Sequence, residues 1–167
     1  MKLIPLYGIR GIGKFAMVDD EDYDYLIQWR WRVILKSNAL YAQRSETINE
    51  FLNRKRKIVL MHRVINKTQK GMLTDHIDHN GLNNQKSNLR TCTTSQNTAN
   101  KIKTKGSSKY LGVEMIKGKK TSWRSYIRFN KKGHSLGSYK TEEEAALAYN
   151  EAAIKYHGEF ANLNIIT

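Results

Sequence analysis

One polar stretch of the chain carries the residues best suited to chemistry. Residues 74–97 contain two Asp, two His and five Asn among few apolar residues. Asp75 and His76 are adjacent, Asn88 follows His76 by twelve positions, and Asn97 follows nine positions later. Carboxylate and carboxamide oxygens suit Mg²⁺, which needs only one or two protein ligands beside water and phosphate. A neutral imidazole beside them could accept a proton from water, so the set would serve metal-assisted hydrolysis of a phosphodiester.

Such chemistry needs rigid support, and the sequence predicts a strand, a loop, a second strand and a helix. Asp75 and His76 end a short strand-like segment. The Asn- and Gly-rich residues 78–87 have the composition of a loop that closes on itself. Residues 88–93 return as a second strand, and Ser95 is expected to cap a helix that starts just after it. The N-terminus of that helix would add a favourable dipole for an anion.

The spacing of these residues resembles the signature of the HNH endonucleases, in its His-Asn-Asn form. The motif Asp-His-Ile-Asp-x-Asn-x-Leu-Asn-Asn, residues 75–84, resembles a motif of phage and intron-encoded homing endonucleases. Met61-His62-Arg63-Val64 resembles a further segment of those proteins, in which His62 either touches the site or packs against it. The resemblance implies a ββα-metal nuclease core at about residues 58–103. It also implies one divalent cation, Mg²⁺ or Mn²⁺, with no structural zinc.

The resemblance assigns roles by position. His76 would be the general base, and Asp75 and Asn97 would be the metal ligands. Asn88 would brace the loop and orient His76, while the other asparagines of the loop would shape its turns. His79 stands where many relatives carry Gly and receives no role. An isolated Asp-His pair in a loop of this composition would be an ordinary turn, so the interpretation depends on the spacing.

The charge of the chain indicates a polyanionic partner. Lys and Arg number 29 against 15 Asp and Glu, a formal net charge of +14. Twelve of these bases and a single acid fall in residues 100–140, whereas residues 141–167 are net acidic. Nucleic acid is the first choice of partner and an anionic membrane surface the second.

The segment before the polar stretch predicts short strands and one acidic turn. The acidic run Asp19–Asp22 is expected to be a solvated turn at the start of a helix over residues 23–29, not a metal cluster. Strands are expected at residues 15–18, 31–35 and 40–43.

The C-terminal part of the chain predicts a compact sheet covered by a helix. A polar linker is expected at residues 100–108. Thr141 and Glu144 form a capping box that starts a helix over residues 142–157, and Gly158 ends that helix. Strands are expected at residues 110–116, 123–129 and 134–139, with turns at 117–120 and 131–133. The sequence therefore predicts an α+β protein, with a nuclease domain over residues 1–99 and a three-stranded antiparallel sheet packed on one helix over residues 109–167.

This C-terminal part resembles the APETALA2-type DNA-binding domain. The resemblance covers about residues 108–164, through Tyr110-Leu-Gly-Val113, Leu136-Gly-Ser-Tyr139 and the helix that follows. It implies that the sheet enters the major groove of double-stranded DNA, with Arg128 at a reader position and lysines at phosphates. Trp123 either stacks on a sugar or fills the core. The residues expected to contact DNA are Arg124, Arg128, Trp123, Lys117, Lys119, Lys120, Lys131, Lys132 and His134.

Several features exclude other classes of protein. No apolar run approaches the roughly 20 residues needed to cross a bilayer, and the N-terminus lacks the features of a secretory signal. The single Cys92 excludes an internal disulfide. Gly8–Lys14 fits part of a phosphate-binding loop, but Phe15 follows where a Ser or Thr is required.

The expectation is therefore a site-specific DNA endonuclease that nicks or cleaves double-stranded DNA. It would be a monomer or weak dimer in the cytoplasm of a bacterial or phage-infected cell, without a membrane partner. The alternative is a non-catalytic DNA-binding regulator, which would not require Asp75, His76, Asn88 and Asn97. A structured-RNA partner rests on charge alone.

Overall fold

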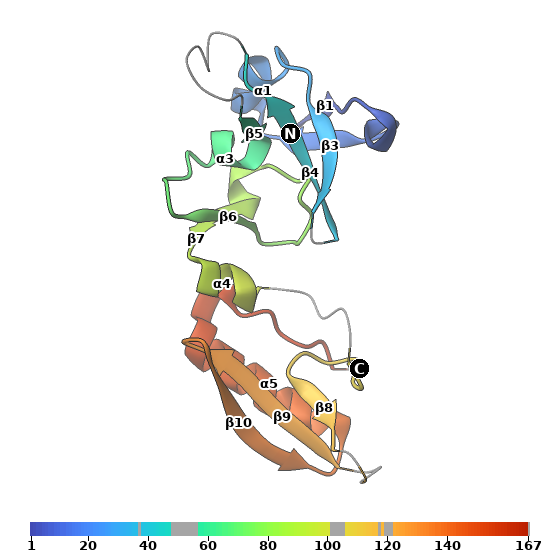
Figure 1. Ribbon diagram of the computed structural model, residues 1–167, viewed down its shortest axis with the longest axis vertical. Coiled ribbons are helices and arrows are strands. Elements are labelled where there is room, and N and C mark those ends of the chain that lie inside the picture. The colour runs from blue at the N-terminus through green and yellow to red at the C-terminus, as the bar shows by residue number, and fades with distance from the viewer. Residues whose placement is uncertain (37, 48–56, 101–105, 117, 119–121, 167) are drawn as a thin grey trace. The chain divides into compact units, whose positions relative to one another are not determined.

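The chain folds as a mixed α and β protein with several small sheets (Figure 1). The computed structural model describes residues 1–36, 38–47, 57–100, 106–116, 118 and 122–166. These residues divide into two compact units, 1–93 and 94–167. Within the described part of the chain, no helix combines the length and apolar character needed to cross a membrane.

The first unit is built on small antiparallel sheets. β1 (Lys2–Pro5) pairs with β2 (Phe15–Val18). β4 (Ala39–Ser45) pairs with both β3 (Arg32–Lys36) and β5 (Ile58–Leu60), which confirms the strand pair predicted near residues 31–43. β6 (Leu73–His76) pairs with β7 (Leu89–Cys92), as predicted for the two strands around the polar loop.

Short helices connect these strands. They are η1 (Ile9–Gly11), α1 (Asp20–Leu26), α3 (Met61–Ile65) and η2 (Lys86–Asn88). α1 begins within the acidic run, earlier than the predicted residue 23, so three acids lie in its first turn, where the helix dipole favours them.

The acidic run also has a long-range role that the sequence did not reveal. Asp19 precedes α1, but its side chain accepts no capping hydrogen bond from that helix. Its carboxylate instead accepts hydrogen bonds from the Lys86 backbone N–H (2.7 Å) and the Gln85 side-chain amide (3.2 Å). The Lys86 ammonium pairs with Glu21 as well. The run therefore lies at the start of a helix, as predicted, and it also anchors the loop before β7.

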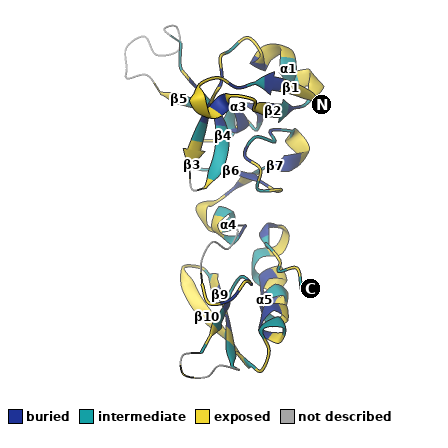
Figure 2. Ribbon diagram, turned by 90° about the vertical axis from the view of Figure 1, so that its right-hand side faces the viewer, coloured by how far each residue is buried: buried dark blue, intermediate teal, exposed yellow. Residues whose placement is uncertain are grey.

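Buried apolar residues from all three sheets of the first unit form one core. Figure 2 colours the buried residues dark blue along the ribbon. Trp31 belongs to this core and has no exposed surface, and its indole N–H donates a 2.8 Å hydrogen bond to the Leu26 carbonyl. The other members of the core are Ile4, Leu6, Ala16, Val18, Leu26, Val33, Ala42, Met61, Ile65 and Leu89. Because Leu89 begins β7, the hairpin that carries Asp75 and His76 is packed on the N-terminal strands.

The loop between β6 and β7 is held on those strands by backbone contacts. The Met17 N–H donates to the Leu82 carbonyl (2.9 Å), and the Asn84 N–H donates to the Met17 carbonyl (2.8 Å). At Gly81 the loop approaches β4 so closely that a Cβ atom would lie 2.3 Å from the Leu40 carbonyl oxygen. A side chain at this position would push the loop away from the sheet.

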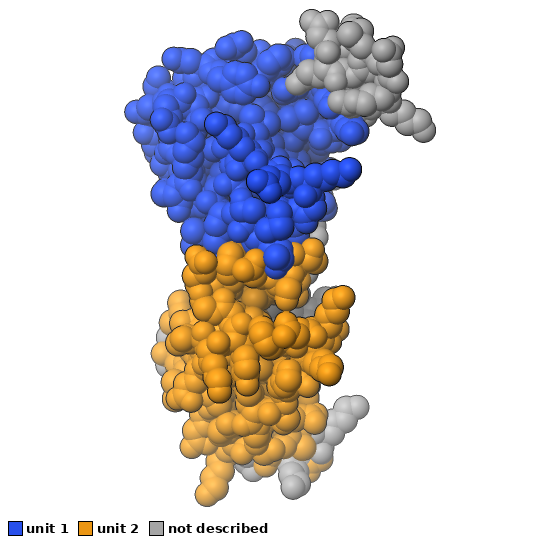
Figure 3. Space-filling view, turned by 90° about the vertical axis from the view of Figure 1, so that its left-hand side faces the viewer, with its two compact units in different colours: residues 1–93 blue, residues 94–167 orange. Residues whose placement is uncertain are grey.

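The second unit, residues 94–167, is coloured orange in Figure 3. It contains the predicted sheet and helix, together with α4 (Thr94–Ala99) and η3 (Gly158–Phe160). β9 (Trp123–Phe129) lies between β8 (Val113–Met115) and β10 (Lys132–Tyr139), antiparallel to both. α5 (Glu142–His157) packs on this sheet through buried alanines and Tyr149. The predicted capping box is present, since Thr141 and Glu144 exchange hydrogen bonds.

Element boundaries in this unit differ from the prediction in three places. α4 begins at Thr94, so Ser95 lies inside the helix and does not cap it. β8 starts only after Gly112, whose positive φ of 66° interrupts the strand. The turn before β10 consists of Asn130 and Lys131 and not of the predicted residues 131–133. Both residues have a positive φ, and two such residues in succession reverse the chain tightly. Most of the expected turn at 117–120 and of the expected linker at 100–108 lies outside the described residues.

The Gly81 contact predicts a destabilised first unit in Gly81→Ala. We expect the free energy of unfolding to fall by about 1–3 kcal/mol, the usual cost of forcing extra atoms into packed structure. Urea unfolding followed by tryptophan fluorescence measures this. Gly133→Ala is the control, because a Cβ atom there meets nothing within 4 Å. Equal stability of the two variants would contradict the close approach.

Candidate functional site

Asp75 and His76 lie at the end of β6, and both are buried, with 6% and 5% of their surfaces exposed. The register of the hairpin places Asp75 opposite Arg90 and His76 opposite Leu89. Buried ionisable groups need partners because burial penalises their charged forms. The contacts of each side chain therefore determine what it can do.

The Asp75 carboxylate is paired with Arg90. The Arg90 guanidinium donates to Asp75 Oδ2 through Nε (2.9 Å) and Nη2 (2.8 Å). The carboxylate is thus compensated and held at a fixed place on the hairpin. Sequence reasoning gave Arg90 no role, although pairing the two predicted strands in register would have found it.

The imidazole of His76 packs among two other rings. The His62 ring from α3 lies edge-on at a centroid distance of 5.1 Å, and the Tyr41 ring from β4 lies at 5.7 Å. Burial lowers the pKa of His62 to about 3, helped by its positive neighbours. Burial also lowers the pKa of His76, against the opposing effects of Asn84 and nearby carboxylates. Both rings are therefore neutral at neutral pH, and His62 packs directly against the predicted base.

Asn84 makes a polar contact with the His76 ring. This side chain is fully buried, and its Oδ1 lies 3.4 Å from His76 Nε2. Asn84 Nδ2 donates to the Leu82 carbonyl, which fixes the amide so that its oxygen faces the imidazole. A carbonyl-type oxygen can only accept, so this contact favours the tautomer with the proton on Nε2. The family resemblance had instead implied that Asn88 orients His76.

Asn88 closes the loop. Its Oδ1 accepts from the Asp78 N–H (2.9 Å), and its Nδ2 donates to the Asp78 carboxylate and to the Asn83 carbonyl, both at 2.8 Å. Asn80 and Asn83 make further turn hydrogen bonds, as expected for these residues. Although burial raises the pKa of Asp78, these donors hold it below its ordinary value. His79 has a φ of 63°, a conformation that favours Gly, which agrees with its place in a tight turn.

The donors that could hold a cation are few. Among the described residues, no group of three or more His, Cys, Asp or Glu side chains gathers at one point. A cation at Asp75 would therefore rely on one carboxylate, an amide oxygen and water, which fits the demands of Mg²⁺. Asp75, His76 and Asn88 belong to the first unit, whereas Asn97 lies on α4 in the second.

The exposed face of β9 carries the predicted DNA-reading arginines. Arg124, Tyr126 and Arg128 alternate with the buried Ser125 and Ile127. The positions opposite them on β10 are Ser138, Ser135 and Gly133, so this face has small side chains beside the arginines. Arg124 is paired with Glu114 at 2.7 Å. Tyr126 was missed by sequence reasoning, although the two-residue period of the strand places it between the arginines.

The remaining residues of the predicted DNA surface occupy different environments. Trp123 is half-buried and packs against Tyr110, Val113 and the α5 alanines, so the core accounts for it. Lys131, Lys132 and His134 are exposed, and the His134 ring stacks on Tyr156. The other three predicted contacts lie outside the described residues: Lys117, Lys119 and Lys120.

The chain is similar to a protein of Acanthamoeba polyphaga mimivirus that is named an uncharacterized HNH endonuclease. The two are 32% identical over 163 residues, covering 94% of this chain and 78% of the viral protein. The similarity therefore extends through both compact units. No family model and no solved structure matches the chain.

The buried His62 predicts a loss of stability in acid. Its folded pKa of about 3 lies below the ordinary 6.5, so its contribution is complete above pH 6.5 and declines as the pH falls toward 3. We expect urea unfolding of His62→Leu to depend less steeply on pH in this window, by up to about 1 kcal/mol per pH unit. His79→Asn, which suits the positive φ, should retain the steep dependence. Parallel profiles for wild type and His62→Leu would contradict the prediction.

Proposed function

The chain belongs to the HNH endonuclease family, and from this we propose that it is a metal-dependent DNA endonuclease that hydrolyses phosphodiester bonds. One observation carries the proposal. His76, an imidazole with a lowered pKa, is buried beside the Asp75 carboxylate in the segment whose spacing matches the family signature. A neutral imidazole is the form that can accept a proton from an attacking water molecule.

His76 is proposed to accept that proton through Nδ1. With Nε2 donating to Asn84, the lone pair on Nδ1 is the ring's basic site. The His62 and Tyr41 rings restrict rotation of the imidazole, and Asn88 closes the loop that carries Asn84. Orientation matters because a general base must lie within hydrogen-bonding distance of the proton it removes.

Asp75 and Asn97 would hold one divalent cation, Mg²⁺ or Mn²⁺, through a carboxylate and an amide oxygen. When bound, the cation stabilises negative charge on the phosphate and on the leaving oxygen. Arg90 binds Asp75 Oδ2 and so keeps this carboxylate at the end of β6, next to the base.

The second unit is proposed to be an APETALA2-type domain that binds double-stranded DNA through the exposed face of β9 and β10. Arg128 would read base edges, while Lys131 and Lys132 would contact phosphates. Tethering this unit to the nuclease raises the effective concentration of the catalytic groups at the sites it binds. With one set of catalytic residues in each chain, a monomer would nick one strand, in the manner of a site-specific homing endonuclease.

Cleavage of supercoiled plasmid tests the nuclease. Wild type with Mg²⁺ or Mn²⁺ should convert supercoiled DNA to open-circular or linear forms, and EDTA should prevent it. His76→Ala should lower the rate by about 10²–10⁴-fold, the usual contribution of a general base. His79→Asn is the matched control and should cleave like wild type, because His79 only shapes the turn. Wild-type protein that shifts DNA in gels but leaves it intact in both metals would instead support the non-catalytic regulator.

The role of Arg128 is tested by Arg128→Lys. The substitution keeps the charge but removes the paired donors that recognise a base, so we expect discrimination between preferred and random sites to fall by about 10–100-fold. Cleavage of the random sites should change little. Competition between two labelled duplexes measures the ratio. An equal loss on all sequences would mean that Arg128 only contacts phosphate.

A further inference from the structure

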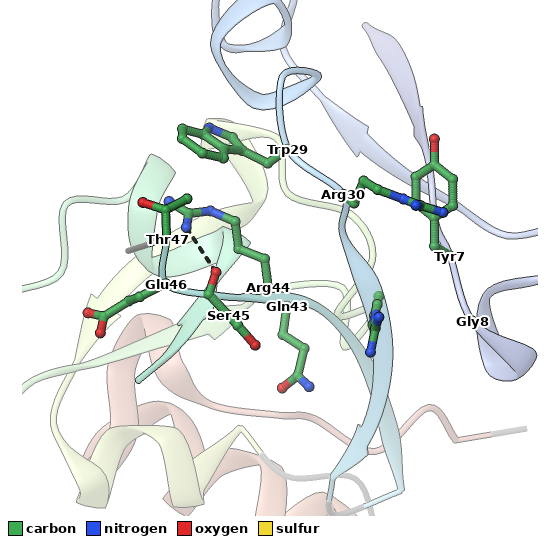
Figure 4. Close-up of a pocket in the computed structure, with 10 residues that line it drawn as sticks. Tyr7, Gly8, Trp29, Arg30, Gln43, Arg44, Ser45, Glu46 and Thr47 are labelled. Atoms are coloured by element: carbon green, nitrogen blue, oxygen red, sulfur yellow. Dashed lines mark hydrogen bonds between the residues drawn. The ribbon is translucent and has the colours of Figure 1, made fainter. Parts of the chain in front are cut away.

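A pocket of about 680 Å³ in the first unit takes no part in the proposed hydrolysis or in the reading face of the second unit (Figure 4). It lies where the segment after β1, the segment before β3 and the end of β4 come together. Three arginines line it, Arg30, Arg32 and Arg44, against one acid, Glu46. The lining is therefore net positive and is shaped by aromatic side chains.

Arg30 and Arg32 line this pocket with exposed side chains. The Arg30 guanidinium lies 4.5 Å from the centroid of the Tyr7 ring. Figure 4 shows the two side chains next to each other. Stacking restrains the guanidinium but leaves its in-plane N–H groups open to a ligand. In the described part of the chain, neither Arg30 nor Arg32 forms an ion pair with a carboxylate.

The remaining charged groups of the lining are fixed in place. Arg44 is buried, lies over the Trp29 ring at 4.2 Å and donates to the Ser45 carbonyl at 3.2 Å. Glu46 accepts a 2.8 Å hydrogen bond from the Lys57 backbone N–H. Arg44 therefore helps to shape the pocket, while Arg30 and Arg32 are its exposed positive groups.

We propose that this pocket binds backbone phosphates of the DNA that the chain cleaves, an inference that rests on the proposed function. Planar guanidinium groups match phosphate oxygens and donate to them in pairs. The contacts would fix the position of the DNA without reading its sequence. They give the N-terminal strands a part in binding the substrate, in addition to their part in supporting the hairpin.

The strand β4 connects this pocket to the candidate active site. Tyr41 on β4 contacts the His76 ring, and Gln43, two residues along the same strand, lines the pocket. Residues two apart point to the same face of a strand and are separated by about 7 Å. The pocket and the candidate active site therefore share one strand of the first unit.

The salt dependence of DNA binding tests the site. The full-length His76→Ala chain, which does not degrade the probe, is compared with the same chain carrying Arg30→Gln and Arg32→Gln. The slope of log K against log salt should fall by about two, because each phosphate contact contributes about 0.9. Lys14→Gln with Lys70→Gln is the matched control, since both lysines are exposed in the first unit and lie outside the pocket. The control pair should change the slope by less than half as much.

Further outcomes separate this inference from the nuclease proposal. The double variant Arg30→Lys, Arg32→Lys keeps both charges. Its slope of log K against log salt should be close to that of the parent chain, which would exclude misfolding as the cause of the loss in the glutamine variant. If both glutamine pairs change the slope equally while wild type cleaves plasmid, the pocket site is overturned and the nuclease stands. If the chain binds an RNA duplex but not a DNA duplex of the same length, both proposals fail.

Discussion

The requirement that buried polar groups be hydrogen-bonded governs the architecture of the first unit. Asp75, His76, Asn84 and Asn88 are all buried at one end of a hairpin only four residues long on each strand. Such a segment would unfold toward water if its donors and acceptors lacked partners. The loop supplies most of these partners itself, through side-chain amides that bond to its own backbone and carboxylate. The high content of Asn in this stretch is thus a condition for burying it.

The N-terminal strands complete what the loop cannot supply. They pair with its backbone at Met17, anchor it through the Asp19 carboxylate, and place the Tyr41 ring against His76. The shared core around Trp31 joins these strands to β7. The first unit therefore works as a platform on which a short hairpin can hold a buried imidazole in one orientation.

Local signals in the sequence were enough for much of the fold. The bounds of β9 and α5 were predicted correctly, because a two-residue alternation and a capping box are properties of neighbouring residues. Asp75 and His76 were placed at the end of their strand for the same reason. The contacts made by Tyr41, Arg90 and Asn84 depend on strand register and loop closure, which bring distant residues together. Asn84 lies in the same kind of local sequence as the other asparagines of its loop. Its neighbours in the sequence therefore do not indicate that it contacts His76.

The ion pair between Asp75 and Arg90 has a consequence for how the hairpin folds. The two residues face each other only in the observed register, and a slip of one residue would put Leu89 or Thr91 opposite the carboxylate. Asp75 would then be buried without its guanidinium, and separating a buried pair costs about 3–5 kcal/mol. The loop contacts at Met17 and the burial of Leu89 favour the same alignment. The same contact that holds the carboxylate beside the base therefore also makes misaligned hairpins less stable than the native one.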